Sequence, residues 1–292
     1  MKCYACDSDN TETLATTTAP FLTERVFDGV EQNVSLIHCK SCGYAWYEPR
    51  LTEEEQQKLY RNYRDDAYAA QRFALEPWYT PQINELLGKN DVYVQSRQRN
   101  LTEILQKFGK TRADRVLDYG GDKGQHIPFL FKDAEKFVFD ISQTPPVPGV
   151  TAFSELDRVF ERKYDFIMCC HLLEHVNDPL HILKIISELA EREAKIYIEL
   201  PFDSPFYKNP LDNLRFLFNP NFPLKTLVRA FIEKLKDRRP KTMHEHINFF
   251  TADSARAMIE KAGFKILLCE KRKLDDDCFG KSAVISVLCE KS

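Results

Sequence analysis

The side chains best suited to hold a nucleoside-containing cofactor lie in a glycine-rich stretch and on the strand expected after it. Residues 116–124 read Val-Leu-Asp-Tyr-Gly-Gly-Asp-Lys-Gly, an apolar run that ends in closely spaced glycines. Glycine has no Cβ atom, so the backbone can turn sharply and approach a ligand closely. Asp140 falls near the end of a second apolar run, 136–141, where a carboxylate can accept hydrogen bonds from ribose hydroxyls. The pattern indicates a nucleoside-cofactor site in an open α/β sheet.

Histidine supplies the candidates for proton transfer, because its side chain titrates near neutral pH. His171 and His175 flank Glu174 directly after an apolar run, 164–170, that we expect to be a buried strand. A second group, His-Glu-His at 244–246, lies much later in the chain. Either group could deprotonate an acceptor if the fold places it beside the cofactor.

Four of the nine cysteines form two pairs, Cys3-x-x-Cys6 and Cys39-x-x-Cys42. Two such pairs can supply four thiolates to one tetrahedral zinc ion, and their separation predicts a small ribbon with a β excursion. The zinc would be structural, because four cysteines leave no open coordination position. A disulfide pair or incidental thiols are the alternatives. No signal peptide precedes Cys3, so we expect a reducing compartment and a cytoplasmic protein.

The elements that must position these residues alternate between strands and helices. Asp178 followed by Pro179 is a typical helix start, an N-cap and then proline in the first turn. The pattern predicts helices at 180–190 and 251–263, and strands at 116–119, 136–141, 164–170, 195–200, 264–271 and 282–290. This order predicts an α/β fold with a doubly wound sheet.

Size and charge exclude some classes of protein. The 292 residues suffice for one average domain and a smaller one. Lys and Arg total 41 and Asp and Glu 44, so nothing in the overall charge attracts nucleic acid. No apolar run approaches the length of a transmembrane helix.

The glycine stretch, the second acid and residues 165–179 together resemble the class I S-adenosylmethionine-dependent methyltransferases. Motif I of that family reads Asp-x-Gly-x-Gly-x-Gly, whereas a dinucleotide site would require Gly-x-Gly-x-x-Gly. The last two predicted strands resemble the antiparallel pair that closes the family's sheet. The resemblance implies a Rossmann-like fold and places S-adenosylmethionine against these residues: Asp118, Gly120, Gly121, Gly124, Asp140, Cys170 and His171.

One position departs from the family pattern, since Asp122 stands where the middle glycine is expected. Aspartate tolerates positive φ better than most residues, so the turn can survive. The alternative is a degraded cofactor site. An arginine such as Arg97 or Arg99 could bind the methionine carboxylate, but an ordinary surface arginine is an equally good interpretation of either.

The segment after the second cysteine pair carries a further resemblance. Residues 39–50, then a capping box at 52–55 and Tyr60, are similar to bacterial methyltransferases in which such a segment precedes the Rossmann core. Those proteins cluster around cell-surface and secondary-metabolite sugars, which implies a sugar or nucleotide-sugar substrate. We therefore expect three parts: a zinc ribbon in 1–50, a helical connector over the cofactor in 51–110, and the methyltransferase core in 111–292.

Residues 204–243 form an insertion in that core, with nine Lys or Arg against three Asp or Glu. In class I methyltransferases, insertions at this point commonly build a substrate lid. A basic lid would suit a phosphorylated or nucleotide-linked sugar. A peripheral membrane helix near a lipid-linked glycan and a solvated basic face are the alternatives.

Residues 244–251 resemble the His-Glu-His-x-x-Tyr-Phe-Ser segment of zinc-containing sugar C-methyltransferases. The resemblance makes Glu245 and His246 candidate acid/base residues, with His171 as the histidine nearer the cofactor. The large C-terminal domain of those enzymes has no counterpart here, so O-, N- and C-methylation stay open. A hydrogen-bonded anchor for the lid is the structural alternative for this triplet. A metal site made by His171, His175, His244 and His246 with an acid is less favoured, since the acids of metal-dependent O-methyltransferases lie in different motifs.

Two other functions compete with sugar methylation. The first is an RNA or protein methyltransferase that uses the ribbon for recognition. Residues 199–202 read Glu-Leu-Pro-Phe and lack the Asn/Asp-Pro-Pro-aromatic motif of enzymes that methylate RNA bases. The second is a non-catalytic binding protein that keeps the fold, an alternative motivated by Asp122.

Overall fold

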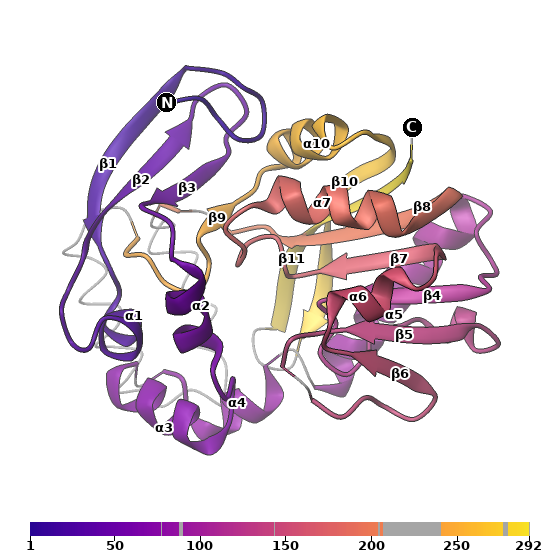
Figure 1. The fold of residues 1–292 in the computed structure, drawn as a ribbon, viewed down its shortest axis with the longest axis horizontal. Helices are drawn as coiled ribbons and strands as arrows, with labels where there is room; N and C mark the ends of the chain where they lie inside the picture. Colours follow the sequence, from indigo (N-terminus) through magenta and orange to yellow (C-terminus); the bar gives the residue numbers. More distant parts are fainter. Residues whose placement is uncertain are drawn as a thin grey trace.

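The computed structural model describes residues 1–76, 78–87, 90–142, 144–203, 205–206, 241–276 and 280–291. Of the predicted basic insertion 204–243, only residues 205–206 and 241–243 are among these, and the rest lies outside the described residues. The described chain forms two sheets with helices packed around them (Figure 1).

The larger sheet has seven strands in the order β10-β11-β8-β7-β4-β5-β6. Pairing is parallel from β8 through β6, while β11 runs antiparallel to β8 and β10 antiparallel to β11. This confirms the predicted doubly wound sheet and its closing antiparallel pair. The strands are β4 (Arg115–Tyr119), β5 (Glu135–Phe139), β6 (Val150–Phe153), β7 (Tyr164–Cys170), β8 (Ala190–Pro201), β10 (Phe264–Asp276) and β11 (Gly280–Lys291).

Helices cover both faces of this sheet, because its central strands are apolar on both sides. Along β7, Phe166 and Met168 pack on Leu101 of helix α5 (Asp91–Lys107). The alternate residues face the other side, where α7 (Pro179–Leu189) and α10 (Ala252–Lys261) pack. Two short helices, α6 (Leu156–Phe160) and η1 (Phe129–Phe131), complete this part.

Local signals place the ends of these helices. The Asp178 side chain accepts a hydrogen bond from the backbone N–H of His181 at the start of α7, as predicted. Thr251 caps α10 as predicted, with Ser254 completing a capping box. Strands β8 and β10 are longer than the sequence predicts. Strand β10 pairs with β11 along nearly its full length as a hairpin, and Ala190 at the start of β8 pairs with Tyr164 of β7.

The smaller sheet is antiparallel and has the order β1-β2-β3-β9. Its strands are β1 (Thr11–Thr17), β2 (Asn33–Cys39), β3 (Ala45–Glu48) and β9 (Asn248–Phe249). Strand β9 comes from the chain after the insertion, so residues far apart in sequence complete the N-terminal sheet. Figure 1 shows this sheet beside α10 and α7 of the larger part.

Helix α1 (Pro20–Val26) connects β1 and β2 within the smaller sheet. Helices α2 (Glu53–Tyr60), α3 (Asp66–Leu75) and α4 (Pro81–Leu86) lie between the smaller sheet and α5 in the chain. The capping box that opens α2 is present, with Thr52 and Glu55 in the expected roles. Helix residues such as Phe21 and Tyr68 share a second core with Tyr47 of β3 and Ile247 beside β9. No helix among the described residues is both long and apolar enough to cross a lipid bilayer.

Candidate functional site

The glycine turn begins at the end of β4, and neighbouring side chains pack so closely against it that two of its positions have no room for a Cβ atom. Gly120 adopts φ +75°, and a Cβ atom there would lie 2.9 Å from the side chain of Leu172. A Cβ on Gly121 would lie 2.1 Å from Cγ of Asp118, well inside contact distance. Gly124 also has positive φ, and its N–H donates to the Gly121 carbonyl at 2.9 Å. The turn therefore requires glycine at 120 and 121 for different reasons.

Asp122 holds the turn together instead of breaking it. Its φ is +53°, in the left-handed region that aspartate tolerates. Its backbone N–H donates to Oδ2 of Asp140 at 2.9 Å, and the N–H of Ser142 donates to Oδ1 at 2.8 Å. The glycine turn after β4 and Asp140 after β5 are thus joined by a hydrogen bond, and the aspartate at position 122 leaves the predicted turn intact.

Asp118 is the buried group that this turn encloses. Its side chain is 1% exposed, and neither carboxylate oxygen has a hydrogen-bond partner within the described part of the chain. Burial, together with the charges of Asp140 and Asp122, raises the pKa of Asp118 to about 7, although the guanidinium of Arg97 opposes the change. An unpartnered carboxylate inside a glycine turn fits a ligand that brings a donor or a positive charge. The amino group of S-adenosylmethionine has both properties.

Arg97 lies buried on α5 as the partner of an acid from β8. Its Nε atom is 2.7 Å from Oε1 of Glu199, and its Nη2 donates to the Tyr93 hydroxyl at 2.6 Å. Arg99, in contrast, is exposed and lies 3.7 Å from Asp275. Of the two arginines considered for the methionine carboxylate, only Arg97 lies near Asp118, and its binding role stays a prediction.

His171 connects this region to a second group of polar residues. It follows β7 with φ +54°. Its Nε2 lies 3.2 Å from the Tyr93 hydroxyl and 3.3 Å from Oε1 of Glu199, and its Nδ1 lies 3.2 Å from Oε1 of Glu174. Burial and Arg97 act to lower the pKa of His171, but the two glutamates outweigh them and raise it. Cys170 precedes it, buried at the end of β7, where burial raises the pKa of its thiol well above the ordinary value.

Glu174, His175 and His246 form a compact cluster beyond His171. One nitrogen or oxygen atom from each lies within 4.8 Å of the others. The His175 and His246 rings meet edge to face, with centroids 4.8 Å apart. Burial opposes the ionisation of Glu174, but His171 and His175 lower its pKa to about 2. Burial lowers the pKa of His175 to about 4, so this imidazole is neutral at pH 7.

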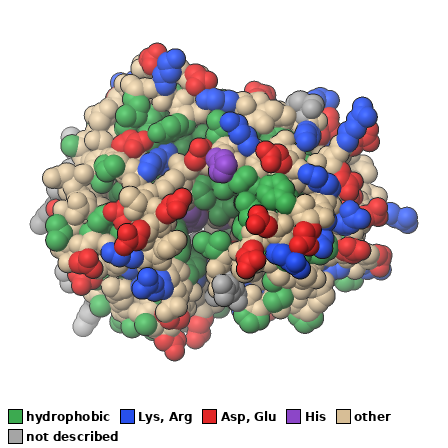
Figure 2. Space-filling model, in the orientation of Figure 1, with side chains coloured by type: hydrophobic (Ala, Val, Ile, Leu, Met, Phe, Trp, Pro, Cys, Tyr) green, Lys and Arg blue, Asp and Glu red, His purple; other side chains and the backbone are tan. Residues whose placement is uncertain are grey.

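His246 is the most exposed of the three, with 35% of its side chain accessible. Its Nδ1 lies 3.5 Å from Oδ2 of Asp203, which follows β8, and Lys241 donates to Oδ1 of the same carboxylate at 2.8 Å. Figure 2 shows histidine side chains at a hollow between the parts that carry the two sheets. The glycine turn 118–124 and Asp140 together form what we call the glycine cradle. His171 lies between this cradle and the histidine cluster of Glu174, His175 and His246.

Glu245 occupies a different environment, although it adjoins His246. Its carboxylate accepts hydrogen bonds from Tyr68 and, at 2.8 Å, from Nη1 of Arg72, both on α3. Burial opposes its ionisation, but Arg72 is the chief cause of a pKa well below the ordinary value. Its neighbour His244 bonds Glu76 at 2.8 Å. A carboxylate held this firmly in the ionised state is a poor acid or base, and its partners favour the anchoring alternative.

Sequence reasoning missed several of these partners. Tyr68, Arg72 and Glu76 lie four residues apart on one helix face, which could have indicated a shared network. Asp203 follows the Pro201 that ends β8, so its position after a strand was a usable signal. The Tyr60 hydroxyl lies 3.0 Å from Nδ1 of His175, and it gave no chemical signal, because a single tyrosine on a helix has no distinctive spacing.

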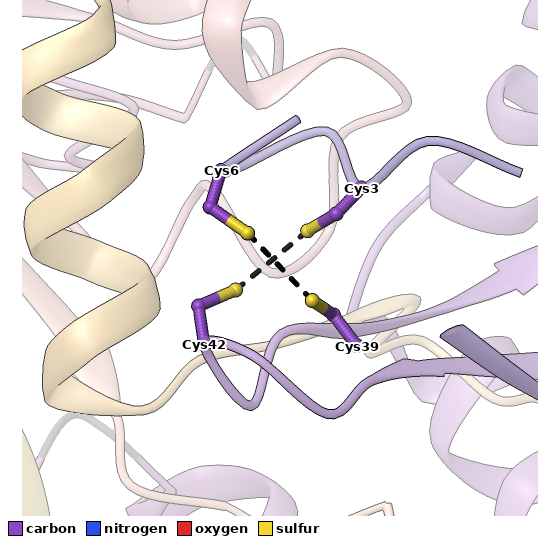
Figure 3. Close-up of side chains that lie close together, drawn as sticks. All are labelled: Cys3, Cys6, Cys39 and Cys42. Carbon is purple, nitrogen blue, oxygen red and sulfur yellow. Dashed lines mark hydrogen bonds between the residues drawn. The ribbon is translucent and has the colours of Figure 1, made fainter. Parts of the chain in front are cut away.

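The four predicted zinc ligands meet at one point (Figure 3). The Sγ atoms of Cys3 and Cys42 are 3.6 Å apart, as are those of Cys6 and Cys39. Four sulfurs at ~2.3 Å from a tetrahedral zinc ion lie about 3.8 Å from one another, so the cluster has the required size. Disulfides require ~2.05 Å, and every cysteine in the described residues is free. The disulfide alternative is therefore wrong for these pairs.

The comparisons with known proteins address the larger sheet and its cradle. Residues 93–268 match the family described as "Methyltransferase domain". Two curated relatives are each named ubiquinone biosynthesis O-methyltransferase. The one from Aeromonas salmonicida is 27% identical over 104 residues, and the one from Pseudoalteromonas translucida is 29% identical over 106. Each match covers 36% of this chain and 37% of the relative.

Solved structures similar to this chain include two from bacteria. An S-adenosylmethionine-dependent methyltransferase from Clostridium acetobutylicum has a TM-score of 0.43 at 12% identity, covering 72% of this chain and 97% of that one. Magnesium protoporphyrin IX methyltransferase from Synechocystis, with bound SAH, has a TM-score of 0.41 at 16% identity, covering 69% and 85%.

Proposed function

This chain belongs to the methyltransferase domain family, and from that premise we propose that it moves the methyl group of S-adenosylmethionine to a sugar hydroxyl. That the chain is an S-adenosylmethionine-dependent methyltransferase follows from the family match over more than half of its length. The acceptor is our proposal. The observation that carries transfer to a hydroxyl is the position of His246 and its carboxylate partner Asp203 in a cluster joined to the glycine turn.

The cradle residues have separate tasks in holding the cofactor, which supplies an electrophilic methyl group on a sulfonium. Asp118 pairs with the amino group, because its carboxylate is buried and has no partner among the described residues. Asp140 binds the ribose hydroxyls, since its two backbone hydrogen bonds leave lone pairs on both oxygens. Gly120 and Gly121 let the backbone approach the ligand. Cys170 and His171 line the end of β7 where the reacting atoms meet.

The acceptor hydroxyl loses its proton to His246. Asp203 faces Nδ1 of this imidazole and favours the tautomer that carries hydrogen there, which leaves Nε2 free to accept a proton. His171 is less suited as the base, because Glu174 and Glu199 occupy both of its nitrogens. We assign His171 to positioning, and Glu245 to anchoring the segment that carries His246.

The sugar acceptor rests on the resemblance of residues 39–60 to the glycan-associated methyltransferases. Transfer to oxygen is supported by the names of the two curated relatives, which are O-methyltransferases. Those names also provide the second candidate, a hydroxyl on a ubiquinone precursor. We do not expect a nucleic-acid partner, given the near-neutral overall charge. Peripheral membrane contact through residues 204–243 stays an alternative prediction from the sequence.

We also propose that the four cysteines hold a structural zinc ion. The site is tied to the core, because the Thr251 hydroxyl donates to the Cys42 carbonyl at 2.6 Å while it caps α10. Thiolate coordination of zinc supports the predicted reducing, cytoplasmic location.

Calorimetric titration with S-adenosylmethionine tests the cofactor site first, beside an Asp140→Ala control. We expect micromolar binding that the control loses. Methyl transfer to a panel of nucleotide sugars and of dihydroxyphenyl acceptors then separates the two candidate substrates. The His246→Ala variant should bind the cofactor normally and lose turnover. Turnover of dihydroxyphenyl compounds alone would replace the sugar proposal by the second candidate.

A further inference from the structure

The cluster of Glu174, His175 and His246 contains the donor atoms of a metal site that is separate from the four cysteines. We propose that these three residues bind one divalent first-row metal ion, with open coordination positions toward the acceptor. Two imidazoles and one carboxylate within 4.8 Å form a donor set typical of such sites. Among the described residues, only this group and the four cysteines bring the ligand atoms of three or more such side chains this close together.

The tautomer of His175 places a lone pair toward the cluster. Its Nδ1 atom lies 3.0 Å from the carbonyl oxygen of Glu245 and 3.0 Å from the Tyr60 hydroxyl. A carbonyl oxygen can only accept, so Nδ1 carries the hydrogen and Nε2 keeps its lone pair. A backbone carbonyl that fixes the outer nitrogen in this way is a common second shell of metal-binding histidines.

Glu174 faces this lone pair from a fully buried position. Its side chain has no exposed surface, and Oε1 lies 3.9 Å from Nε2 of His175. His171 is 3.2 Å from the same oxygen, yet neither carboxylate oxygen has a well-formed hydrogen bond among the described residues. Two acceptor atoms thus face each other in a buried place, an arrangement that a cation between them stabilises.

Each expected ligand has an outer partner that orients it. The carbonyl of Glu245 orients His175, His171 contacts Glu174, and Asp203 lies 3.5 Å from Nδ1 of His246. The carboxylate–histidine pair at His246 repeats a recurrent feature of metal centres. This explains why Glu245 is held rigidly by Tyr68 and Arg72: its backbone positions one ligand and its neighbour is another.

The geometry requires a modest closure around the ion. Ligand atoms at ~2.1 Å from a metal lie about 3.0–3.4 Å apart, so atoms that lie within 4.8 Å of one another must approach by at most about 1.8 Å. His246 can supply this movement, since its side chain is the most exposed of the three. Three protein ligands leave positions open for oxygen atoms of water or an acceptor.

The role of the ion rests on the proposed function, whereas its binding does not. With the ion bound, His246 is a ligand, and this replaces the role of base proposed for it. A hydroxyl bound to the ion ionises more readily, and its proton passes to solvent water, which can reach the half-exposed His246 end of the cluster. Two neighbouring hydroxyls, as in a sugar diol, could occupy the open positions together. The substrate class that fits the site is therefore a vicinal diol.

Titration with Mn²⁺, followed by electron paramagnetic resonance, tests the site directly. The protein is first supplied with one equivalent of Zn²⁺, which the four thiolates take in preference. We expect one Mn²⁺ per chain, bound at least tenfold more weakly by His246→Ala and by Glu174→Gln. His181→Ala, which removes an exposed imidazole outside the cluster, is the matched control and should bind like the wild type.

Zinc content and far-UV circular dichroism show whether each variant is folded. If Glu174→Gln does not fold, the comparison of His246→Ala with His181→Ala still tests the site. Absence of stoichiometric Mn²⁺ binding, or equal affinity in His246→Ala and His181→Ala, overturns the metal site. Methyl transfer measured on the same samples separates the two proposals. Turnover without Mn²⁺ binding refutes the metal site alone, and Mn²⁺ binding without turnover on any hydroxyl supports it while the proposed function fails.

Discussion

Replacing Asp118 by asparagine should stabilise the cofactor-free protein while it weakens cofactor binding. The Asp118 carboxylate is buried, unpartnered among the described residues, and has its pKa raised from 3.8 to about 7. A raised carboxyl pKa means that the folded state holds the proton more tightly than the unfolded state. Ionisation of Asp118 therefore leaves the free energy of unfolding unchanged below pH 3.8, lowers it progressively between pH 3.8 and 7, and keeps it lowered by a constant amount above pH 7.

The size of this effect follows from the two pKa values. At 1.36 kcal/mol per pH unit, the cost of ionising Asp118 above pH 7 is about 4 kcal/mol. Asparagine removes the charge but leaves a buried amide without a fixed partner, which costs about 1–3 kcal/mol. The net gain at pH 8 should therefore be about 2 kcal/mol. The affinity for S-adenosylmethionine should fall at least tenfold, because the amino group loses its carboxylate.

Urea denaturation at several pH values, without cofactor, measures the free energy of unfolding for both proteins. The difference between Asp118→Asn and the wild type should grow from pH 4 to pH 8, with calorimetry supplying the loss of affinity. Asp133→Asn changes an exposed carboxylate and should leave both quantities unaltered. A difference that is the same at pH 5 and pH 8 would refute the assignment of an unpaired, hard-to-ionise carboxylate in the cradle.

Three further predictions concern the anchor, the base and the ribbon. Glu245→Gln should lower the free energy of unfolding by about 2 kcal/mol, because Arg72 loses one of its two buried carboxylate partners and keeps Glu76. The kcat of the folded enzyme should change less than threefold, and a hundredfold loss of kcat at unchanged stability would restore Glu245 as the acid/base residue. Asp203→Asn should lower kcat by about 10²-fold with little change in the Kd of the cofactor, since His246 loses its orienting carboxylate, and steady-state kinetics with calorimetry checks both. Cys42→Ser should lose zinc by elemental analysis and lower the Tm, whereas retention of one zinc per chain would contradict the four-cysteine site.

Much of the fold could be predicted because its signals are local. The apolar runs of β4, β5, β7 and β8 are bounded by glycines, acids and Pro201, which mark strand ends in the sequence itself. The caps Thr52, Asp178 and Thr251 lie at the starts of the helices where the sequence placed them. Strand lengths were less predictable, because the start of β8 depends on pairing with β7 and the length of β10 on pairing with β11.

The candidate site divides in the same way. The glycine turn with Asp118 and Asp140, and the two cysteine pairs, could be recognised because each needs fixed spacing over a few residues. The sequence left two roles open for Glu245, an acid/base residue or an anchor, since the choice depends on Arg72, which lies 173 positions earlier.

The sequence by itself determined six strands of the larger sheet, the helices α7 and α10, the cofactor turn and the pairing of the cysteines into two short motifs, because these follow from backbone preferences and short-range spacing. Only the tertiary structure decided that His246 lies beside Glu174 and Asp203, and that Arg97 forms an ion pair with Glu199. It also decided that β9 completes the N-terminal sheet. The physical reason is that a buried charge needs a partner, and the partner is whichever polar residue the packed chain brings beside it. Residues far apart in the sequence make these pairs, and no periodic sequence pattern predicts which of them will be neighbours.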